Sequence, residues 1–322
     1  MIIEIITPAG AGSRAGNRHT ATRWAGLLRE LGHDVAVSTC WSGRPAEMMI
    51  ALHARRSHES AKQFRTTNPA SALVIVLTGT DLYRDIRTDR DAQDSLSIAD
   101  RLVVLQEMGG FALHASLRAK TRVIYQSARS RAPAQAPTGI FRIAVVGHLR
   151  GEKDPFRAAI ALRSMTDLSN MQVVQIGQAL APQFEARARR FMELDPRYRW
   201  IGSVPHWQAL RWMARSHALV VSSRMEGGAN VIAEAAVIGV PVIASQVPGN
   251  VGMLGRNYPG YFRPGDHQDL ARQLRRAATS DKYYAQLRRM LSARRRRFLP
   301  DAERIALRQL VAEFSPRPRS RR

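Results

Sequence analysis

The chain has 322 residues, of which 45% are hydrophobic, and its 49 Lys and Arg residues against 26 Asp and Glu give a formal net charge of +23. This length suits two globular domains of about 150 residues better than one. A single cysteine, Cys40, excludes an intrachain disulfide, and no uncharged apolar run approaches the ~20 residues that span a bilayer. Because the first residues also lack the pattern of a signal peptide, we predict a cytoplasmic protein without stable membrane insertion.

The excess positive charge is carried mostly by arginine. Such a bias fits nucleic acid, anionic lipid or phosphorylated substrates, and composition does not choose among them. No nucleic-acid recognition motif accompanies the arginines, and few aromatic residues alternate with them, so we expect no nucleic-acid partner. The arginine run 294–297 indicates a solvated helix face, and the segment 315–322 predicts a disordered basic tail.

The first half of the sequence alternates between strand and helix patterns. An apolar stretch at 2–7 leads into a Gly-rich loop, a helical pattern follows at 19–31, and a second strand is predicted at 33–39. This order predicts a βαβ unit with a parallel sheet. Further strands are predicted at 72–77, 102–105 and 121–125.

The alternation restarts after the segment 127–138, which is rich in proline and poor in large apolar residues and is typical of a linker. Strands are then predicted at 141–146, 171–176, 198–201, 218–221 and 240–245, and helices at 154–165, 182–193, 206–216 and 229–238. From 268 to 314 the pattern is helical, with an interruption near Pro300. The whole predicts an α/β fold of two Rossmann-like, doubly wound domains that face each other across a cleft.

One polar segment of the second half, SSRMEGGANVIAE at 222–234, lies between a predicted strand and a predicted helix. Gly227 and Gly228 let the backbone approach a ligand closely, and the start of the helix offers unpaired N–H groups to a phosphate. Glu226 and Glu234 could then hold a sugar hydroxyl and a ribose diol. The alternative is that Glu226 caps the helix and Glu234 is a solvated position. The nearly uncharged run after Glu234 favours the binding role.

This segment, together with GVPVIA at 239–244, resembles the signature of GT-B glycosyltransferases of the family-4 kind. The motif VGHLRGEKD at 146–154 is similar to the one whose basic residues hold the donor diphosphate, and Lys153 matches the family lysine. His148 stands where an arginine is usual, and Arg150 offers a guanidinium two residues later. WIGSV at 200–204 and the loop 10–17 are similar to the segments that contact the nucleotide base and the donor phosphates.

The resemblance implies a metal-independent hexosyltransferase that binds a UDP-sugar and needs no cofactor. The helix dipole and basic side chains would stabilise the departing nucleoside diphosphate. Glu234 would hold the ribose, Glu226 the transferred sugar, and Asn230 and Val231 the phosphates. The implied catalytic residues are Lys153, Glu226 and Arg150, and the implied donor-binding residues are Gly16, Asn17, His148, Ile201, Gly227, Gly228, Asn230, Val231 and Glu234.

The first domain concentrates cations where its loops should face the cleft, and Thr78 stands where many relatives have a histidine. These clusters favour an anionic acceptor, because a nucleophile that is already an anion needs little help from a general base. A solvated face is the alternative for each cation, and a helix cap is the alternative for Asp81. The acceptor-binding candidates are Arg18, His53, Arg55, Arg56, Thr80 and Asp81.

Several strings resemble one subgroup of the family, the selenosugar synthases of selenoneine biosynthesis; they include LHARR at 52–56, LTGTDLY at 77–83 and YPGYF at 258–262. This resemblance implies that selenophosphate attacks the anomeric carbon of UDP-N-acetylglucosamine and that UDP and phosphate are released, leaving a 1-selenosugar. Selenium is soft and polarizable, so positioning and charge neutralisation would matter more than proton abstraction. A glycosyltransferase with a hydroxyl acceptor is the alternative.

The domain limits follow from these patterns. We predict an acceptor-side domain at 1–128, a linker at 129–139 and a nucleotide-sugar-binding domain at 140–298. By analogy with such enzymes, a C-terminal helix at 299–314 packs back on the first domain, before the basic tail at 315–322.

Overall fold

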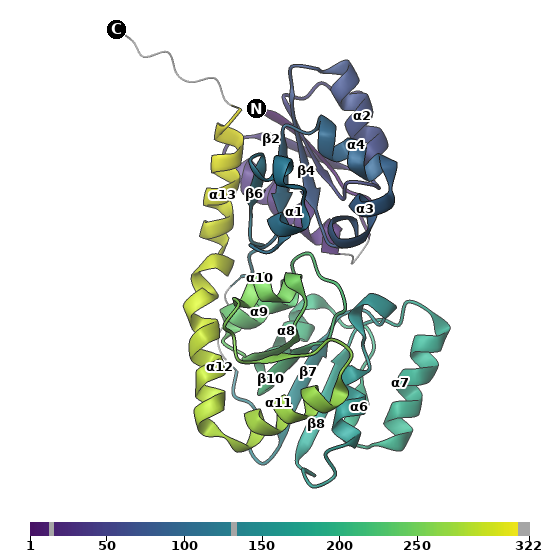
Figure 1. Ribbon diagram of the computed structural model, residues 1–322, viewed down its shortest axis with the longest axis vertical. Coiled ribbons are helices and arrows are strands. Elements are labelled where there is room, and N and C mark those ends of the chain that lie inside the picture. Colours follow the sequence, from purple (N-terminus) through teal and green to yellow (C-terminus); the bar gives the residue numbers. More distant parts are fainter. Residues whose placement is uncertain (13–15, 130–133, 315–322) are drawn as a thin grey trace. The chain divides into compact units, whose positions relative to one another are not determined.

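The computed structural model describes residues 1–12, 16–129 and 134–314, and within it the chain forms two compact units (Figure 1). The first unit joins Met1–Gln126 to the segment that begins at Pro300, and the second is Ser127–Leu299. The predicted linker 129–139 includes residues outside the described ranges, and the predicted tail 315–322 lies wholly outside them.

A six-stranded parallel sheet forms the centre of the first unit, with the strand order β2-β1-β3-β4-β5-β6. Its strands are β1 (Ile2–Ile6), β2 (Asp34–Ser38), β3 (Met48–Leu52), β4 (Ala72–Leu77), β5 (Arg101–Val104) and β6 (Thr121–Val123). Its helices are α1 (Gly16–Glu30), α2 (His58–Thr67), α3 (Ile86–Thr88), α4 (Arg90–Ile98), α5 (Ala115–Arg118) and α13 (Pro300–Ala312), with a π-helix, η1, at Asp81–Asp85 and a 3-10 turn, η2, at Gly109–Ala112.

Two apolar layers cover this sheet because successive strand residues point to opposite faces. On one face Ile50 and Val74 pack with Trp24 of α1 and Leu307 of α13. On the other face the alternate strand residues pack with α2 and α4, for example through Phe64. The helix that ends the chain therefore belongs to the core of the unit that begins it.

A buried carboxylate joins α13 to α1. Glu303 is inaccessible to solvent and accepts hydrogen bonds from Arg23 Nε (2.8 Å) and Trp24 Nε1 (2.6 Å). A buried charge is tolerated only when it is paired and hydrogen-bonded, which Arg23 and Trp24 together provide.

The central strand β3 is a finding that the sequence analysis did not anticipate. Its sequence, MMIAL, contains a single β-branched residue and no alternation, so its β propensity is low. All five residues are nonetheless buried between β1 and β4. The segment therefore forms a strand because both of its faces are buried in the sheet, not because of its β propensity.

The second unit also contains a six-stranded parallel sheet, in the order β12-β11-β10-β7-β8-β9. Its strands are β7 (Phe141–Val146), β8 (Met171–Ile176), β9 (Tyr198–Trp200), β10 (Ala218–Val221), β11 (Val242–Ser245) and β12 (Tyr261–Phe262). Its helices are α6 (Arg157–Arg163), α7 (Pro182–Leu194), α8 (His206–Ala214), α9 (Asn230–Ile238), α10 (Pro248–Leu254), α11 (His267–Thr279) and α12 (Asp281–Arg294), with 3-10 turns η3 (Gly151–Lys153) and η4 (Arg295–Phe298).

The two sheets confirm the predicted class of two Rossmann-like α/β domains. The predicted strands at 72–77, 141–146, 171–176 and 218–221 are confirmed with the same limits. The short elements α10 and β12 were not predicted, because α10 contains two glycines and β12 has only two residues. None of the described helices combines the length and the apolar character needed to cross a bilayer.

Candidate functional site

In the second unit, two neighbouring strands deliver the predicted catalytic side chains. β7 and β10 are paired and parallel, so the loops that follow them leave the same edge of the sheet. Lys153 closes the turn after β7, and Glu226 lies in the loop after β10. Lys153 Nζ forms an ion pair with Glu226 Oε1 at 2.5 Å. Parallel topology thus brings together two residues that are 73 positions apart.

Glu226 is held in place by its own loop as well as by Lys153. Ser223 Oγ donates to the same carboxylate oxygen at 2.5 Å, and Glu226 as a whole residue is only 8% exposed. The loops are also tied to each other, since Ser222 Oγ donates to the Asp154 carbonyl (2.9 Å) and the Arg224 amide donates to the Glu152 carbonyl (2.8 Å). The pair therefore rests on a shared hydrogen-bonded frame.

Two close backbone approaches require glycine around this pair. A Cβ on Gly249, at the start of α10, would lie 1.8 Å from the Glu226 carbonyl oxygen. A Cβ on Gly177 would lie 2.0 Å from the Gly147 carbonyl oxygen, and Gly177 has φ +147°. Because both distances are far below van der Waals contact, any side chain there would displace the loops that carry Glu226 and His148.

The helix α9 begins directly after the glycine turn and lacks a side-chain cap. Its N-cap residue is Ala229, which has no side chain able to accept a hydrogen bond from the first turn. The Oδ1 atom of Asn230, the first residue of the helix, is buried and has no hydrogen-bond partner in the described part of the chain. The N–H groups of the first turn leave hydrogen-bond donors for an anion, which the positive end of the helix dipole favours, whereas Asn230 Oδ1 leaves an acceptor for a hydroxyl or N–H group.

Glu234 lies further along α9 and is paired with a residue that the sequence analysis did not select. His206 Nε2, at the start of α8, lies 2.8 Å from Glu234 Oε1. The glutamate side chain is 14% exposed and the histidine 62%. Glu234 is thus not a solvated position. A ligand that takes the Oε1 atom of this carboxylate must displace His206.

The other predicted donor residues lie at different places. Gly227 is buried, Gly228 and Val231 are half-buried beside the turn, and Ile201 packs against the apolar cluster of Val174 and Ile176. Arg150 is about half exposed, 3.9 Å from Glu152. Gly16 and Asn17 open α1 in the first unit, where Thr20 Oγ1 donates to the Gly16 carbonyl (3.0 Å). Residues 13–15 of the predicted phosphate-side loop lie outside the described residues.

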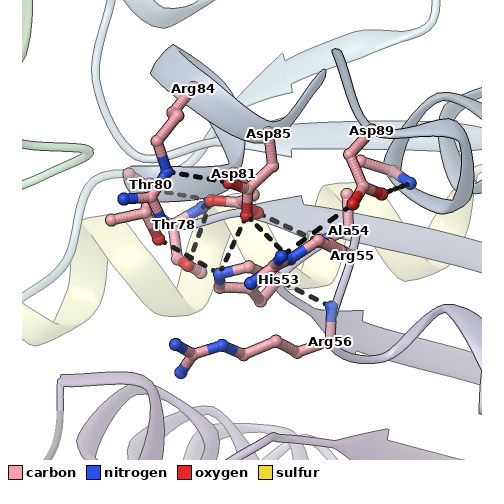
Figure 2. A network of polar contacts seen from close by, with 12 residues as sticks. His53, Ala54, Arg55, Arg56, Thr78, Thr80, Asp81, Arg84, Asp85 and Asp89 are labelled. Carbon is pink, nitrogen blue, oxygen red and sulfur yellow. Dashed lines mark hydrogen bonds and ion pairs between the residues drawn. The ribbon is translucent and has the colours of Figure 1, made fainter. Parts of the chain in front are cut away.

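In the first unit, Asp81 links two loops (Figure 2). It opens η1 after β4 and is completely buried. Its Oδ1 accepts from the amides of Thr78 and Gly79, both at 2.9 Å, and its Oδ2 accepts from the amide of Ala54 at 3.0 Å. The carboxylate satisfies backbone donors after both β3 and β4, so it fixes the shape of this region.

His53 occupies a conformation that is unusual for a residue with a side chain. Its φ is 77°, in the left-handed region, and it follows β3 directly. Its Nδ1 accepts from the Arg56 amide (3.3 Å), and its Nε2 lies 3.1 Å from Thr80 Oγ1. Burial is the main cause that lowers the pKa of His53, followed by an opposing effect of Asp81. Nδ1 is therefore the acceptor, and the neutral ring carries its proton on Nε2.

The arginine side chains around His53 differ in whether a carboxylate compensates their positive charge. Arg55 Nε lies 3.2 Å from Asp85 Oδ2, and Arg84 Nε donates to Asp85 Oδ1 at 3.0 Å. The guanidinium of Arg56 points away from these carboxylates (Figure 2) and forms no ion pair with any described residue. Arg18, in the first turn of α1, likewise has no ion-pair partner among the described residues. Arg56 and Arg18 thus keep uncompensated charge.

The residues that sequence reasoning missed are partners of the residues it found. Ser223 and His206 orient the two glutamates, and Asp85 compensates Arg55 and Arg84. Ser223 stands three residues before Glu226, a spacing that could have indicated it. His206 and Glu234 are 28 positions apart and meet only in the fold. Across the described ranges, no three His, Cys, Asp or Glu side chains group together as metal ligands.

Solved structures share this two-domain architecture over nearly the whole chain. A sucrose-phosphate synthase from Thermosynechococcus elongatus aligns with a TM-score of 0.80 at 15% identity, covering 97% of this chain and 98% of its own. Anabaena HepE in complex with UDP-glucose aligns with a TM-score of 0.77 at 14% identity, covering 97% and 100%. A glycosyltransferase from Rickettsia africae gives 0.69 at 14% identity, covering 97% of each chain. The fold is therefore that of GT-B glycosyltransferases.

The sequence assigns the chain to a particular glycosyltransferase family, which the fold alone does not do. The chain belongs to the family of glycosyl transferases group 1, whose sequence model matches residues 126–296. No curated protein matches the chain by sequence. The matched range contains the Lys153–Glu226 pair and α9, so the protein is a glycosyltransferase whose family region coincides with the second unit.

Proposed function

We propose that this glycosyltransferase takes its sugar from a UDP-sugar, with UDP-N-acetylglucosamine as the donor, and transfers it to selenophosphate. The observation that carries the donor half is the Lys153–Glu226 ion pair beside the uncapped start of α9. A cation, a carboxylate and free helix N–H groups within one pair of loops match a diphosphate joined to a sugar. HepE, whose structure contains UDP-glucose, has the same fold.

Each residue of the second unit takes a role that follows from its surroundings. Lys153 and Arg150 neutralise the diphosphate as the bond to the anomeric carbon breaks, together with the N–H groups of α9 and the amide of Asn230. Glu226, freed from Lys153 when the diphosphate arrives, accepts a hydrogen bond from a sugar hydroxyl. Glu234 accepts from the ribose diol once His206 moves away.

The acceptor half rests on the charges of the first unit. Arg56 and Arg18 have no ion-pair partners among the described residues and can seat a small trianionic acceptor. His53 is neutral, and its ring atoms are occupied by Arg56 N and Thr80 Oγ1, so it is poorly placed to remove a proton from an alcohol. An acceptor that is already an anion needs no such base. Asp81 and Thr80 shape the loop that presents these groups.

The proposed reaction balances as two displacements. The selenium of selenophosphate attacks the anomeric carbon, the C–Se bond forms, and the bond from that carbon to the UDP oxygen breaks with its electron pair leaving on UDP. Water then cleaves the P–Se bond, which releases phosphate and leaves the 1-selenosugar as a selenol. No oxidant or reductant takes part.

Incubation of the purified protein with UDP-N-acetylglucosamine and enzymatically generated selenophosphate tests the proposal. We expect a selenium-containing sugar by mass spectrometry, with stoichiometric UDP and phosphate. Glu234→Ala should weaken UDP binding, and inorganic phosphate offered in place of selenophosphate should give no sugar product. Transfer to an alcohol without any selenium product would overturn the acceptor assignment and keep the donor assignment. Absence of UDP binding would overturn both.

A further inference from the structure

The second unit has another basic region besides the loops that carry Lys153 and Glu226. A groove of about 460 Å³ in the second unit is lined by Arg142, Trp207, Gln208, Arg211, Trp212 and Arg215. Arg142 is the second residue of β7, whereas Lys153 follows the last residue of that strand. The Arg142 end of the groove therefore lies toward the opposite, amino-terminal edge of the sheet, and at its other end Trp207 directly follows His206 at the start of α8.

Helix α8 presents a row of side chains along this groove. Trp207 and Arg211 in α8 and Arg215, which directly follows its last residue, stand at intervals of four residues and so lie along one side of the helix, over a length of about 12 Å. Trp207 is 51% exposed, which is unusual for so large an apolar ring. Trp212 is half-buried, and the guanidinium of Arg142 lies 5.4 Å from its ring centroid. The groove thus alternates aromatic rings with guanidinium groups.

The guanidinium groups here lack carboxylates. Within the described part of the chain, no Asp or Glu forms an ion pair with Arg142, Arg199, Arg211 or Arg215. The side chain of Arg142 donates to Gln172 Oε1 (2.9 Å), a neutral partner. Burial, and then the positive charges of Arg215 and Arg199, lower the pKa of Arg142, although the group stays protonated. Mutual repulsion among these cations is a cost that a bound polyanion would relieve.

A solvated helix face is the competing explanation, and two observations argue against it. Arg211 and Arg215 lie at the C-terminal end of α8, where cations stabilise a helix without any ligand. That explanation does not cover the half-buried Arg142, which comes from a strand, or the exposed ring of Trp207. An acidic peptide would need the cations but not the ring. A lipid surface would need several protruding apolar side chains, and the lining offers only the two tryptophans.

Contrary to the expectation from the sequence alone, we propose that this groove binds single-stranded nucleic acid, with a base stacked on Trp207 and phosphates on Arg142, Arg211 and Arg215. Stacking on an exposed aromatic ring combined with a basic groove is the usual way in which proteins hold single strands without sequence preference. The net charge of +23 increases the rate and strength of the encounter. This inference does not depend on the proposed donor or acceptor.

Fluorescence anisotropy with a labelled ten-nucleotide oligouridine tests the proposal on the full-length protein. We expect salt-sensitive binding that Trp207→Ala weakens by about tenfold through loss of stacking. The double variant R211A/R215A should reduce the salt slope by about two, because each lost phosphate contact removes about one. The matched control is R288A/R289A, which removes the same charge from exposed positions of α12. R211A/R215A and R288A/R289A should both retain glycosyl transfer.

Three results would overturn the inference. If R288A/R289A weakens binding as much as R211A/R215A, the oligonucleotide responds only to total charge. If Trp207→Ala binds as tightly as the wild type, no base stacks in the groove. Binding to anionic phosphatidylglycerol vesicles that Trp207→Ala abolishes, with no binding of oligouridine, would assign the groove to a membrane surface instead.

Discussion

In the second unit the ion pair between Lys153 and Glu226 joins two loops at one edge of the sheet, and the pair is partly exposed. In the first unit, by contrast, Asp81 is fully buried and accepts hydrogen bonds from three backbone amides of the loops around it. A ligand can compete for the first arrangement, because the Lys153 side chain is 26% exposed. It cannot reach the second. Asp81 therefore organises the loops around it, whereas the Lys153–Glu226 pair is the part that we propose contacts the donor.

The same difference divides the acceptor candidates. Asp81, His53 and Thr80 form the internal network, and Arg55 is compensated by Asp85. Arg56 and Arg18 alone among the six keep unpaired charge within the described residues. Substitutions in this internal network should therefore mostly change stability or pH response, whereas substitutions of Lys153 or Glu226 should change transfer.

Lys153→Ala should have the largest effect, on catalysis. Removing the cation beside the diphosphate should lower kcat/KM about 10²–10³-fold, as the loss of one preorganised donor to a developing charge commonly does. The fold should survive, because Ser223 still donates to Glu226. The measurement is UDP release under the proposed transfer conditions. Lys282→Ala, at an exposed position of α12, is the matched loss of one lysine and should leave the rate unchanged.

Asp81→Ala should have the largest effect on stability. It leaves three backbone N–H groups without their acceptor, and each unsatisfied buried group costs about 1–3 kcal/mol, so the free energy of unfolding should fall by about 3 kcal/mol or more. Urea unfolding followed by circular dichroism measures this. Asp301→Ala, at an exposed position in the first turn of α13, should change stability by less than about 0.5 kcal/mol. Equal unfolding midpoints for the two variants would show that Asp81 is not a structural link.

Gly249→Ala should connect stability and binding within the second unit. The added Cβ would lie 1.8 Å from the Glu226 carbonyl oxygen, so α10 or the Glu226 loop must shift. We expect a loss of about 1–3 kcal/mol in the free energy of unfolding, the range for overpacking, together with weaker UDP binding. Gly26→Ala in α1 has open space around its Cβ and should be neutral or stabilising. Normal UDP affinity in Gly249→Ala would separate the Glu226 loop from donor binding.

His206→Ala should have a small effect in the opposite direction. The exposed pair with Glu234 is worth about 0.2–1 kcal/mol, and a ligand that needs Glu234 must break it. Removing the histidine should therefore tighten UDP binding by up to about fivefold in a calorimetric titration. Weaker binding would show instead that His206 itself contacts the donor.

His53→Asn should give the smallest effect, on the pH dependence of stability. The folded state holds His53 at a pKa below its ordinary 6.5, mainly through burial, so below that pH the unfolded chain binds the proton more readily. The contribution of His53 is complete above about pH 6.5 and declines as the pH falls toward its lower folded value. Asparagine tolerates the left-handed backbone and does not titrate. Urea midpoints at pH 5 and pH 7.5 should differ less in the variant than in the wild type.

The sequence predicted those structural elements that depend on residues close together in the chain better than those that depend on contacts between distant segments. Strands such as β4 and β7 are rich in β-branched residues and lie between clear turn signals, so their limits were predictable. β3 was not, because burial on both faces rather than propensity makes it a strand. The glycine turn at 227–228 was recognisable from local spacing.

The candidate site shows the same limit. Lys153 and Glu226 were each selected from their motifs, but their contact depends on β10 pairing with β7 rather than with its sequence neighbour β9. The pairing of His206 with Glu234 likewise needs α8 and α9 to pack together. Long-range contacts of this kind have no signature in a single sequence.

The position of α13 has a consequence for how the protein is made. Residues 127–299 form a unit that is contiguous in the sequence, whereas the first unit lacks Glu303, Leu307 and Leu310 until α13 leaves the ribosome. Until then Trp24 and Arg23 have no carboxylate to bind, and the face of the sheet that α13 covers stays open. The domain that is begun first is therefore completed last, and a chain that stops short of residue 303 leaves it without its buried anchor.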